Sequence, residues 1–345
     1  MKKRLVIVIF SIFIALALGI TFRAQIHENI TKSPSSSLTL PQQMPVLSSE
    51  EIRITTNEVV PSPKIKNYLS GEAIIWQDHR DPVKAFIYTR DSANTERLVK
   101  ISSSAKYNPS ISGNKLLWSE FRNKQWDLFM YDLLTEQETQ ITNNDLPESE
   151  FTMDGNKIVW KERENTNFPY NIFMYDLSTN KKTQITNDIE HQTSPDISGD
   201  RIVWVDHKTF NNKDIKMWDP INGIQDVTTA DYSQINPSIN GDKIVWQDER
   251  DGPFDIYMYD ISTGRETQIT NDNSKQQINP DVFGETIIWQ DSSYDIFMWS
   301  PLTGEQLITT NPSVQINPSI SGNNIAWFDD RNEKLDIYMK KIVEQ

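Results

Sequence analysis

Three short runs decide the fold of this chain: Asn236-Pro-Ser-Ile-Asn-Gly-Asp-Lys-Ile-Val-Trp246-Gln-Asp248-Glu-Arg250, Asp255-Ile-Tyr-Met-Tyr-Asp260 and Glu266-Thr-Gln-Ile-Thr270. The same order of motifs occurs seven times. A Trp marks the corresponding position of every copy and recurs every 38 to 44 residues: Trp76, Trp118, Trp160, Trp204, Trp246, Trp289 and Trp327. Self-similarity at such a period is the signature of a repeat architecture.

Each copy contains four segments with strand-like patterns. The first, such as 237–240, is short and ends in a Gly-polar pair, which suits the positive φ of a two-residue hairpin turn. The second and third, such as 244–246 and 256–259, are apolar without alternation, which indicates that both faces are covered. The fourth, 267–270, alternates as a half-exposed strand does. Four-stranded sheets of about 40 residues, covered by their neighbours, are the blades of a β-propeller.

The two ends of the repeat region predict how the ring closes. The run Glu51-Ile-Arg-Ile-Thr-Thr56 resembles a fourth strand but precedes any first strand, and the last copy, from Asn317 to Val343, has only three strands. An N-terminal strand that completes the last blade would leave no open edge in the ring. We therefore predict an all-β fold, a seven-bladed β-propeller over residues 51–345, with the N-terminal strand closing the last blade.

The order of the motifs resembles the TolB-like, WD40-like (PD40-type) propeller repeats of exported and cell-surface proteins in bacteria and archaea. The shared pattern is Pro-x-Ile-Ser-Gly, Ile-Val-Trp-x-Asp, Asp-Ile-Tyr-Met-Tyr-Asp and Ile-Thr, over residues 51–343. The resemblance implies a propeller of the cell envelope. It implies no particular activity, because such repeats serve many roles.

The N-terminal segment predicts export. Residues 1–4 are basic after Met1, and 5–22 carry no charge, so 1–23 is a signal anchor or a cleaved signal peptide. Residues 24–50 are rich in Ser and Pro and predict a spacer. We therefore expect the propeller outside the cytoplasm, periplasmic or extracellular, anchored to the cytoplasmic membrane through the N-terminal segment, or secreted if that segment is cleaved.

Composition excludes several classes of function. The 345 residues include 34 basic and 48 acidic residues, a net charge of −14, so nucleic acid is a poor partner. The absence of Cys excludes disulfides, thiol catalysis and thiolate metal sites. No motif of a serine-hydrolase elbow, a phosphate-binding loop or a zinc protease occurs. We expect a monomeric propeller without a cofactor.

A carboxylate follows the marker Trp by two residues in every copy. These acids are Asp78, Glu120, Glu162, Asp206, Asp248, Asp291 and Asp329. A sevenfold ring of carboxylates could bind cations. Because an element present in every blade is more simply one that each blade needs, we expect structural acids that bind loop amides, the neighbouring blade or the base two residues later.

A binding site needs unlike groups around one point, so it should lie where the repeat departs from itself. The longest connections between second and third strands are 163–170 and 207–213, in adjacent copies. Together with the connection into the fourth copy, they hold the candidate ligand-binding residues Phe168, Tyr170, His191, His207 and Phe210. The aromatic side chains either bind a partner or brace the loops against each other. His191, His207 and Asp206 are a legitimate metal-ligand set, but without local ligand spacing we predict no metal site.

Two functions remain open from the sequence. The first is a non-catalytic, membrane-tethered scaffold that binds a protein or a polysaccharide of the cell envelope. The alternative is a carbohydrate-active enzyme similar to the propeller oligouronide lyases, which use histidines and a divalent metal. The chain has only four His, which disfavours the alternative, and we predict no catalytic residues.

Overall fold

The computed structural model describes residues 45–55, 68–78, 86–90, 96–99, 106–144, 148–163, 165, 167–209 and 212–344. The chain divides into two units, Met1–Gln43 and Met44–Gln345, and every described residue belongs to the second. The predicted signal segment 1–23 lies outside the described residues, as does most of the predicted spacer. In the described part, no helix has the length and apolar character needed to cross a membrane.

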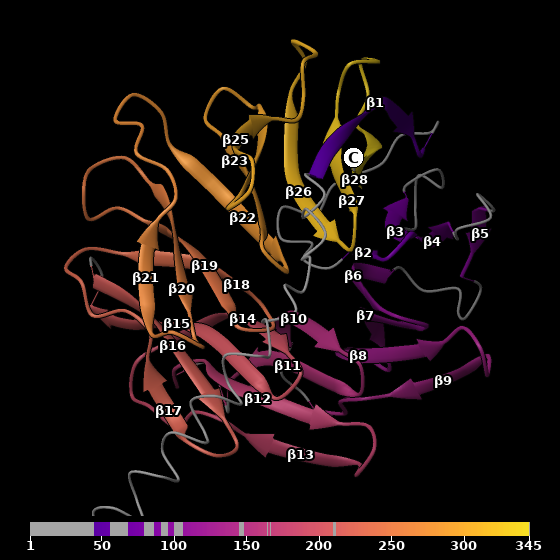
Figure 1. Ribbon diagram of the computed structural model, residues 1–345. Coiled ribbons are helices and arrows are strands. Elements are labelled where there is room, and N and C mark those ends of the chain that lie inside the picture. Colours follow the sequence, from indigo (N-terminus) through magenta and orange to yellow (C-terminus); the bar gives the residue numbers. More distant parts are fainter. Residues whose placement is uncertain are drawn as a thin grey trace, which may run out of the picture. The chain divides into compact units, whose positions relative to one another are not determined.

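Seven four-stranded antiparallel sheets lie around a ring, which confirms the seven-bladed β-propeller (Figure 1). Blades 1 to 3 consist of β2 (Leu69–Ser70), β3 (Ala73–Asp78), β4 (Phe86–Arg90) and β5 (Glu96–Leu98); β6 (Lys106–Ser112), β7 (Lys115–Arg122), β8 (Gln125–Asp132) and β9 (Gln137–Gln140); and β10 (Ser149–Asp154), β11 (Lys157–Glu162), β12 (Asn171–Asp176) and β13 (Lys181–Gln184). Blades 4 to 6 consist of β14 (Gln192–Ser198), β15 (Arg201–Thr209), β16 (Asn212–Asp219) and β17 (Gly223–Asp226); β18 (Gln234–Asn240), β19 (Lys243–Asp248), β20 (Asp255–Asp260) and β21 (Arg265–Gln268); and β22 (Gln277–Phe283), β23 (Thr286–Asp291), β24 (Ile296–Ser300) and β25 (Gly304–Leu307). Blade 7 consists of β26 (Gln315–Ser321), β27 (Asn324–Asp329), β28 (Asp336–Glu344) and β1 (Pro45–Arg53).

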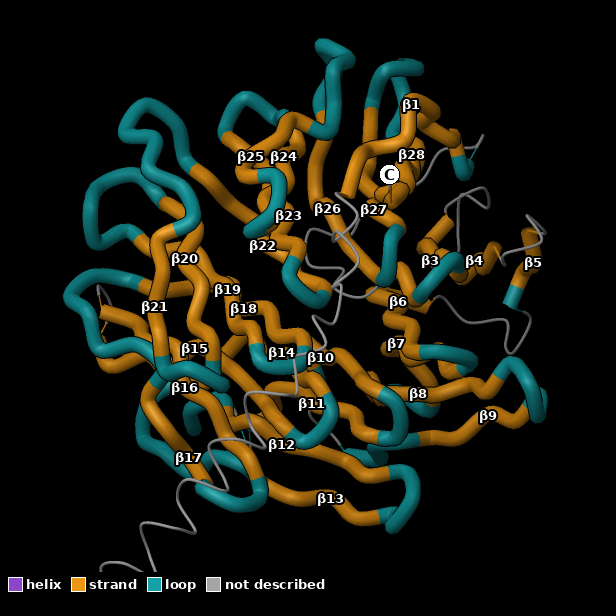
Figure 2. Tube along the Cα trace, in the orientation of Figure 1, coloured by secondary structure: helices purple, strands orange, loops and turns teal. Residues whose placement is uncertain are grey.

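The antiparallel order gives the propeller two different faces. Connections between second and third strands, and from one blade to the next, lie at one end of the blades, which we call the loop face. The turns between first and second strands, and between third and fourth strands, lie at the other end, which we call the turn face. Figure 2 shows the strands of the described blades in orange and the loops and turns that join them in teal.

Strand β1 closes the ring. It pairs with β28 in an antiparallel register that places Glu51 opposite Lys340 and Arg53 opposite Tyr338. The predicted N-terminal closing strand is therefore confirmed. It begins at Pro45 rather than at Glu51, because Pro45 to Leu47 also pair with β28 before the register shifts. The end of the segment that we interpreted as spacer thus belongs to blade 7.

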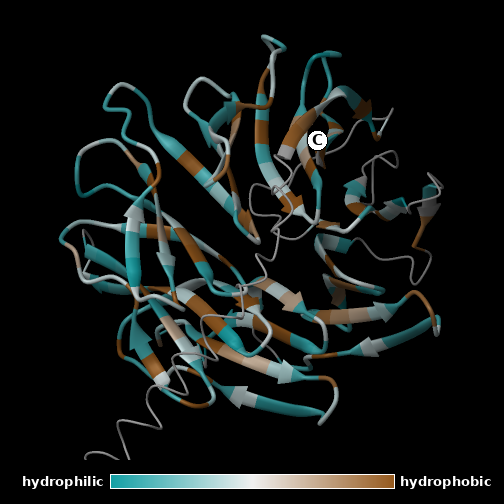
Figure 3. Ribbon diagram, viewed as in Figure 1, coloured by the Kyte–Doolittle hydropathy of each residue, from teal (hydrophilic) through white to brown (hydrophobic). Residues whose placement is uncertain are grey.

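The marker tryptophans form the core between blades and are all fully buried. In blade 5 the ring of Trp246 stacks on Tyr257, directly opposite on β20, with centroids 6.1 Å apart. Equivalent stacked pairs are Trp76–Tyr88, Trp118–Phe129, Trp160–Phe173, Trp289–Phe297 and Trp327–Tyr338. The outer strands β9 and β13 are mostly hydrophilic in contrast (Figure 3). Burying these rings between the blades supplies much of the apolar area that holds the propeller together.

A belt of hydrogen bonds joins the blades at the turn face. In blade 5 the turn residue Gly241 has a φ of +56°, which glycine adopts without strain, and its N–H donates to Ser198 Oγ of blade 4 at 3.0 Å. The residue before each turn glycine accepts this bond from the next blade in the pairs Gly71–Ser321, Gly113–Ser70, Gly155–Ser112, Gly199–Asp154 and Gly284–Asn240. Phe283 occupies this position in blade 6 and has no side-chain acceptor.

Candidate binding face on blades 3 and 4

The connections of blades 3 and 4 meet at the loop face around Tyr170 and His191. The backbone N–H of Tyr170 donates to Nδ1 of His191 at 3.1 Å, and the two rings lie 5.6 Å apart. The N–H of Gln192 donates to the Tyr170 carbonyl at 2.8 Å. Because Nδ1 of His191 accepts a hydrogen bond, the neutral ring carries its proton on Nε2. The end of the loop in blade 3 is therefore fastened to the start of blade 4.

His207 extends this cluster from the hairpin of β15 and β16. Its ring lies 6.3 Å from that of His191, and its Nε2 lies 2.9 Å from Thr193 Oγ1. Burial lowers the pKa of His207, and the positive charges of Lys213 and Lys161 lower it further. His207 is therefore neutral at neutral pH and gains its charge only in acid.

Two cations lie over the ring of Tyr170. Lys161 Nζ is 4.8 Å and the Arg163 guanidinium carbon 4.9 Å from the ring centroid, within the range of a cation–π interaction. Lys161 is also paired with Glu150 at 2.9 Å. Among the described residues, no carboxylate lies within ion-pair distance of Arg163. A protein of net charge −14 thus presents an arginine without a described counter-ion at this point of its surface.

The structure brings together three of the five candidate residues. Tyr170, His191 and His207 form the cluster, and Tyr170 acts as a brace between the two connections. Phe168 lies two residues before Tyr170 with half of its surface, 50%, exposed, so it is not a brace. Phe210 lies outside the described residues. The carboxylate of Asp206 is bound by Gln192 and Lys216.

The repeated carboxylates bind the marker tryptophans. Nε1 of Trp246 donates to Asp248 Oδ2 at 2.9 Å inside the blade. Equivalent bonds join Trp118 to Glu120, Trp160 to Glu162 and Trp327 to Asp329. In blades 4 and 6 the indole instead donates to a glutamine of the first strand, in the pairs Trp204–Gln192 and Trp289–Gln277. The side chain of Asp78 lies outside the described part.

An arginine joins these carboxylates to the outer strand. Arg250 binds Asp248 at 2.5 Å and Glu266 of β21 at 2.7 Å, and its guanidinium lies 4.5 Å from the centroid of Tyr257. Arg122 and Arg331 repeat the arrangement with Glu138 and Glu51. In blades 2, 5 and 7 the buried carboxylate thus has an indole and a guanidinium as partners, which offset the several kcal/mol that desolvating a charge costs. Among the described residues, no three His, Asp or Glu side chains are grouped so that they could hold a metal ion.

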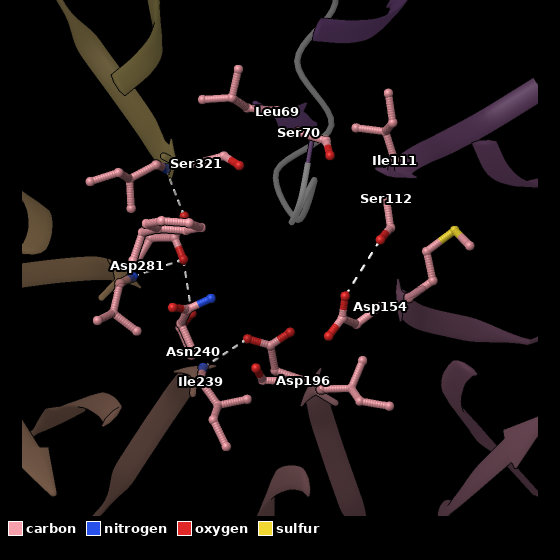
Figure 4. A pocket seen from close by; sticks show the side chains of 17 residues that line it. Leu69, Ser70, Ile111, Ser112, Asp154, Asp196, Ile239, Asn240, Asp281 and Ser321 are labelled. Carbon is pink, nitrogen blue, oxygen red and sulfur yellow. Dashed lines mark hydrogen bonds between the residues drawn. The ribbon is translucent and has the colours of Figure 1, made fainter. Parts of the chain in front are cut away.

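The first strands around the central channel depart from the sevenfold pattern by carrying buried or half-buried carboxylates in some blades. A cavity of about 210 Å³ lies among the first strands near the turn face, with carboxylates of Asp154, Asp196 and Asp281 around it (Figure 4). Asp196 accepts the N–H of Ile239 at 3.0 Å. Asp281 accepts hydrogen bonds from Ser238 Oγ at 2.8 Å and from the N–H of Ile320 at 2.9 Å. These acids therefore join blades 4 to 7 across their interfaces.

Burial raises the pKa of Asp281 to about 6, and the nearby Asp196 contributes to this rise. The signal for these residues was present in the sequence. Asp196 and Asp281 stand where Ser110, Ser238 and Ser319 stand in other copies, directly after a proline. These departures from the repeat lie in first strands, whereas the candidate residues above lie in loops.

Comparisons with known proteins show the class of fold. No protein-family model matches this sequence, and no curated protein matches it. Among solved structures, oligogalacturonate lyase from Vibrio parahaemolyticus is similar with 11% identity and a TM-score of 0.64, covering 86% of this chain and 96% of that chain. The β-propeller domain of the Trilobed protease from Pyrococcus furiosus is similar with 12% identity and a TM-score of 0.64, covering 88% and 96%.

TolB from Acinetobacter baumannii is also similar, with 17% identity and a TM-score of 0.47 over 76% of this chain and 60% of that chain. At these identities the structural likeness shows the fold alone. The chain is a seven-bladed β-propeller with TolB and enzyme domains among its structural neighbours. The Pyrococcus domain is described as having an open velcro topology, whereas β1 closes the ring in this chain.

Proposed function

We propose that this propeller is a non-catalytic scaffold of the cell envelope, tethered to the membrane by its N-terminal segment, that binds a protein or polysaccharide at the loop face of blades 3 and 4. The observation that carries the proposal is that one loop holds both Arg163, a cation without a described counter-ion, and the half-exposed ring of Phe168. Arginine and aromatic side chains are the residues that most often anchor binding interfaces. The histidines and Tyr170 hold the loop that presents them.

The alternative, a carbohydrate lyase with a divalent metal, has less support. The structural likeness to oligogalacturonate lyase concerns the fold at 11% identity. In the described part, His191 and His207 lie together, but each already makes a hydrogen bond and the nearby Asp206 is bound by Gln192 and Lys216. Metal analysis of the purified protein separates this alternative from the scaffold.

The test uses the full-length protein to capture components from native envelope. The double variant Arg163→Gln/Phe168→Ser removes the positive charge and the half-exposed ring of this loop. Its control, Arg201→Gln/Leu134→Ser, removes the same charge and an exposed apolar side chain from the turn face, where Leu134 is 81% exposed. We expect the first variant to lose at least tenfold in capture, or about 1.4 kcal/mol, with an unchanged melting temperature. Equal capture by the two double variants would contradict the proposal.

A further inference from the structure

We propose that the ligand of the loop face is an acidic polysaccharide, whose carboxylate or sulfate groups bind Arg163 and whose sugar rings lie on aromatic side chains of blades 2 and 3. This inference rests on the proposed function and specifies its ligand. Two features of the molecule favour such a ligand: the charge on blade 3 and a second aromatic cluster on blade 2.

The charge on blade 3 favours an anion. Arg163 follows β11 and lies with Lys161 over the ring of Tyr170, and Lys213 lies on the adjacent connection of blade 4. The planar guanidinium matches a carboxylate or sulfate with two parallel hydrogen bonds. Nε of Arg163 is buried, so a ligand would reach the other two nitrogens of this guanidinium.

A second aromatic cluster lies on the neighbouring blade at the same face. Trp126 and Phe121 are opposite each other at the end of the β7–β8 hairpin, which corresponds in blade 2 to the 163–170 connection of blade 3. Their rings lie 5.5 Å apart, and Tyr107 packs against Trp126 at 5.4 Å. Phe121 keeps 49% of its surface exposed, as Phe168 keeps 50% in blade 3. Lys124, at the turn of this hairpin, is also exposed.

Two exposed rings on adjacent blades suit an extended chain of sugars. The face of an aromatic ring is apolar and carries partial negative charge, so it attracts the C–H groups on the flat side of a sugar. A peptide is usually bound by strand addition at a sheet edge or by side chains inserted in a pocket. The free sheet edges lie at the outer strands, and the 210 Å³ cavity lies near the turn face. Exposed rings with a nearby guanidinium therefore fit a charged glycan better.

The experiment measures binding of the full-length protein, in a mild detergent, to four immobilised polymers at two salt concentrations. Hyaluronate and dextran sulfate carry the expected anions, neutral dextran carries none, and poly-L-glutamate represents an acidic peptide. We expect binding to the two acidic polysaccharides that weakens with salt, and none to neutral dextran. Arg163→Gln should weaken it at least tenfold and Phe121→Ser at least threefold, whereas Arg201→Gln at the turn face should change it less than twofold.

Three results would overturn the inference. The first is no binding to either acidic polysaccharide. The second is equal loss in Arg163→Gln and Arg201→Gln, which would mean that the anion binds elsewhere or through overall charge. The third is equally strong, Arg163-dependent binding to poly-L-glutamate, which would identify an acidic peptide. If envelope capture depends on Arg163 and Phe168 while no polysaccharide binds, the scaffold function stands and this ligand class is wrong. If capture is also unaffected, both are wrong.

Discussion

Blades 5 and 4 are neighbours with the same four strands and different interiors. In blade 5, Trp246 stacks on Tyr257 and donates its indole proton to Asp248, while Arg250 covers the tyrosine and joins Asp248 to Glu266 of the outer strand. Blades 2 and 7 repeat this arrangement. It forms a continuous layer from the core to the outer strand.

Blade 4 keeps the tryptophan and replaces its partners. Lys216 stands opposite Trp204, where blade 5 has a tyrosine, and the indole donates to Gln192 instead of the acid. Asp206 is bound by Gln192 and Lys216. The two blades show that the fold requires a partner for the indole N–H and for the buried acid, since a buried polar group without one is costly, but does not require a particular partner. Blade 4 has Lys208 at the position of Arg250, two residues after the acid, and His207 lies between Asp206 and Lys208.

Removing the outer strand of blade 7 should have the largest effect. Blade 7 resembles blade 5, but its outer acid, Glu51, comes from the far end of the chain. Deleting residues 45–55 should cost several kcal/mol and cause aggregation, because it exposes the edge of β28. Glu51→Gln and Glu266→Gln, which break the same pair in blades 7 and 5, should each cost only about 1 kcal/mol or less. Urea denaturation measures all three, and an unchanged midpoint after the deletion would show that β1 does not close the ring.

Replacing the repeated acid should affect blade 5 more than blade 4. Asp248→Asn places an amide where the carboxylate accepts the indole and the guanidinium, and should cost about 1–3 kcal/mol. Asp206→Asn should cost less, since the indole of Trp204 donates to Gln192.

Calcium and chelator should leave the melting temperature of the unsubstituted protein unchanged. Equal losses in the two variants would mean that the indole bond contributes little. A calcium-dependent rise in the melting temperature that Asp248→Asn abolishes would instead support a cation ring.

Making blade 3 resemble blade 5 should alter the pH dependence of stability. Glu148 of blade 3 stands where blade 5 has Gln234, and burial, with Glu162 nearby, raises its pKa to about 7. The folded protein therefore keeps a proton that the unfolded chain releases near pH 4.5, so stability falls as the pH rises between these values. Glu148→Gln should remove this slope and stabilise the protein by roughly 1–2 kcal/mol at pH 8.

Melting temperatures at pH 5, 6, 7 and 8 test this third prediction. The curves of the variant and the unsubstituted protein should lie close together at pH 5 and separate at pH 8, with the variant higher. Gln234→Glu in blade 5 is the reverse exchange and should introduce a similar slope. Parallel curves for Glu148→Gln would mean that Glu148 ionises in the folded protein as it does in the unfolded chain.

The sequence predicted the fold because its signals are local and repeated. Tryptophans at a constant period, turn glycines and a surplus N-terminal strand sufficed for the number of blades and the closure. The bond between Trp246 and Asp248 was missed, although residues two apart on a strand lie on the same face. Its geometry depends on side-chain torsions, and the indole N–H was not counted as a donor that needs a partner.

The candidate site was predictable only in part. The sequence places His191 and His207 in connections at the same end of blade 4, and in the structure their rings lie 6.3 Å apart. That Arg163 has no described counter-ion and that Tyr170 is a brace depend on which way each loop turns, which the repeat pattern does not specify. The channel acids Asp196 and Asp281 were visible as departures from serine but lay in strands that looked regular.

The hydrogen-bond belt at the turn face has a consequence for how such a ring can change its size. Each blade of this belt carries a donor and an acceptor. The turn glycine, such as Gly241, donates its N–H to the preceding blade, and the residue before it, such as Asn240, accepts the N–H of the following blade. A tandem duplication or deletion of one whole repeat therefore preserves a matching joint on each side, without any compensating substitution. Phe283 has no side-chain acceptor at this position. At the junction of blades 6 and 7, a copy inserted next to it would therefore lack the acceptor for its glycine N–H.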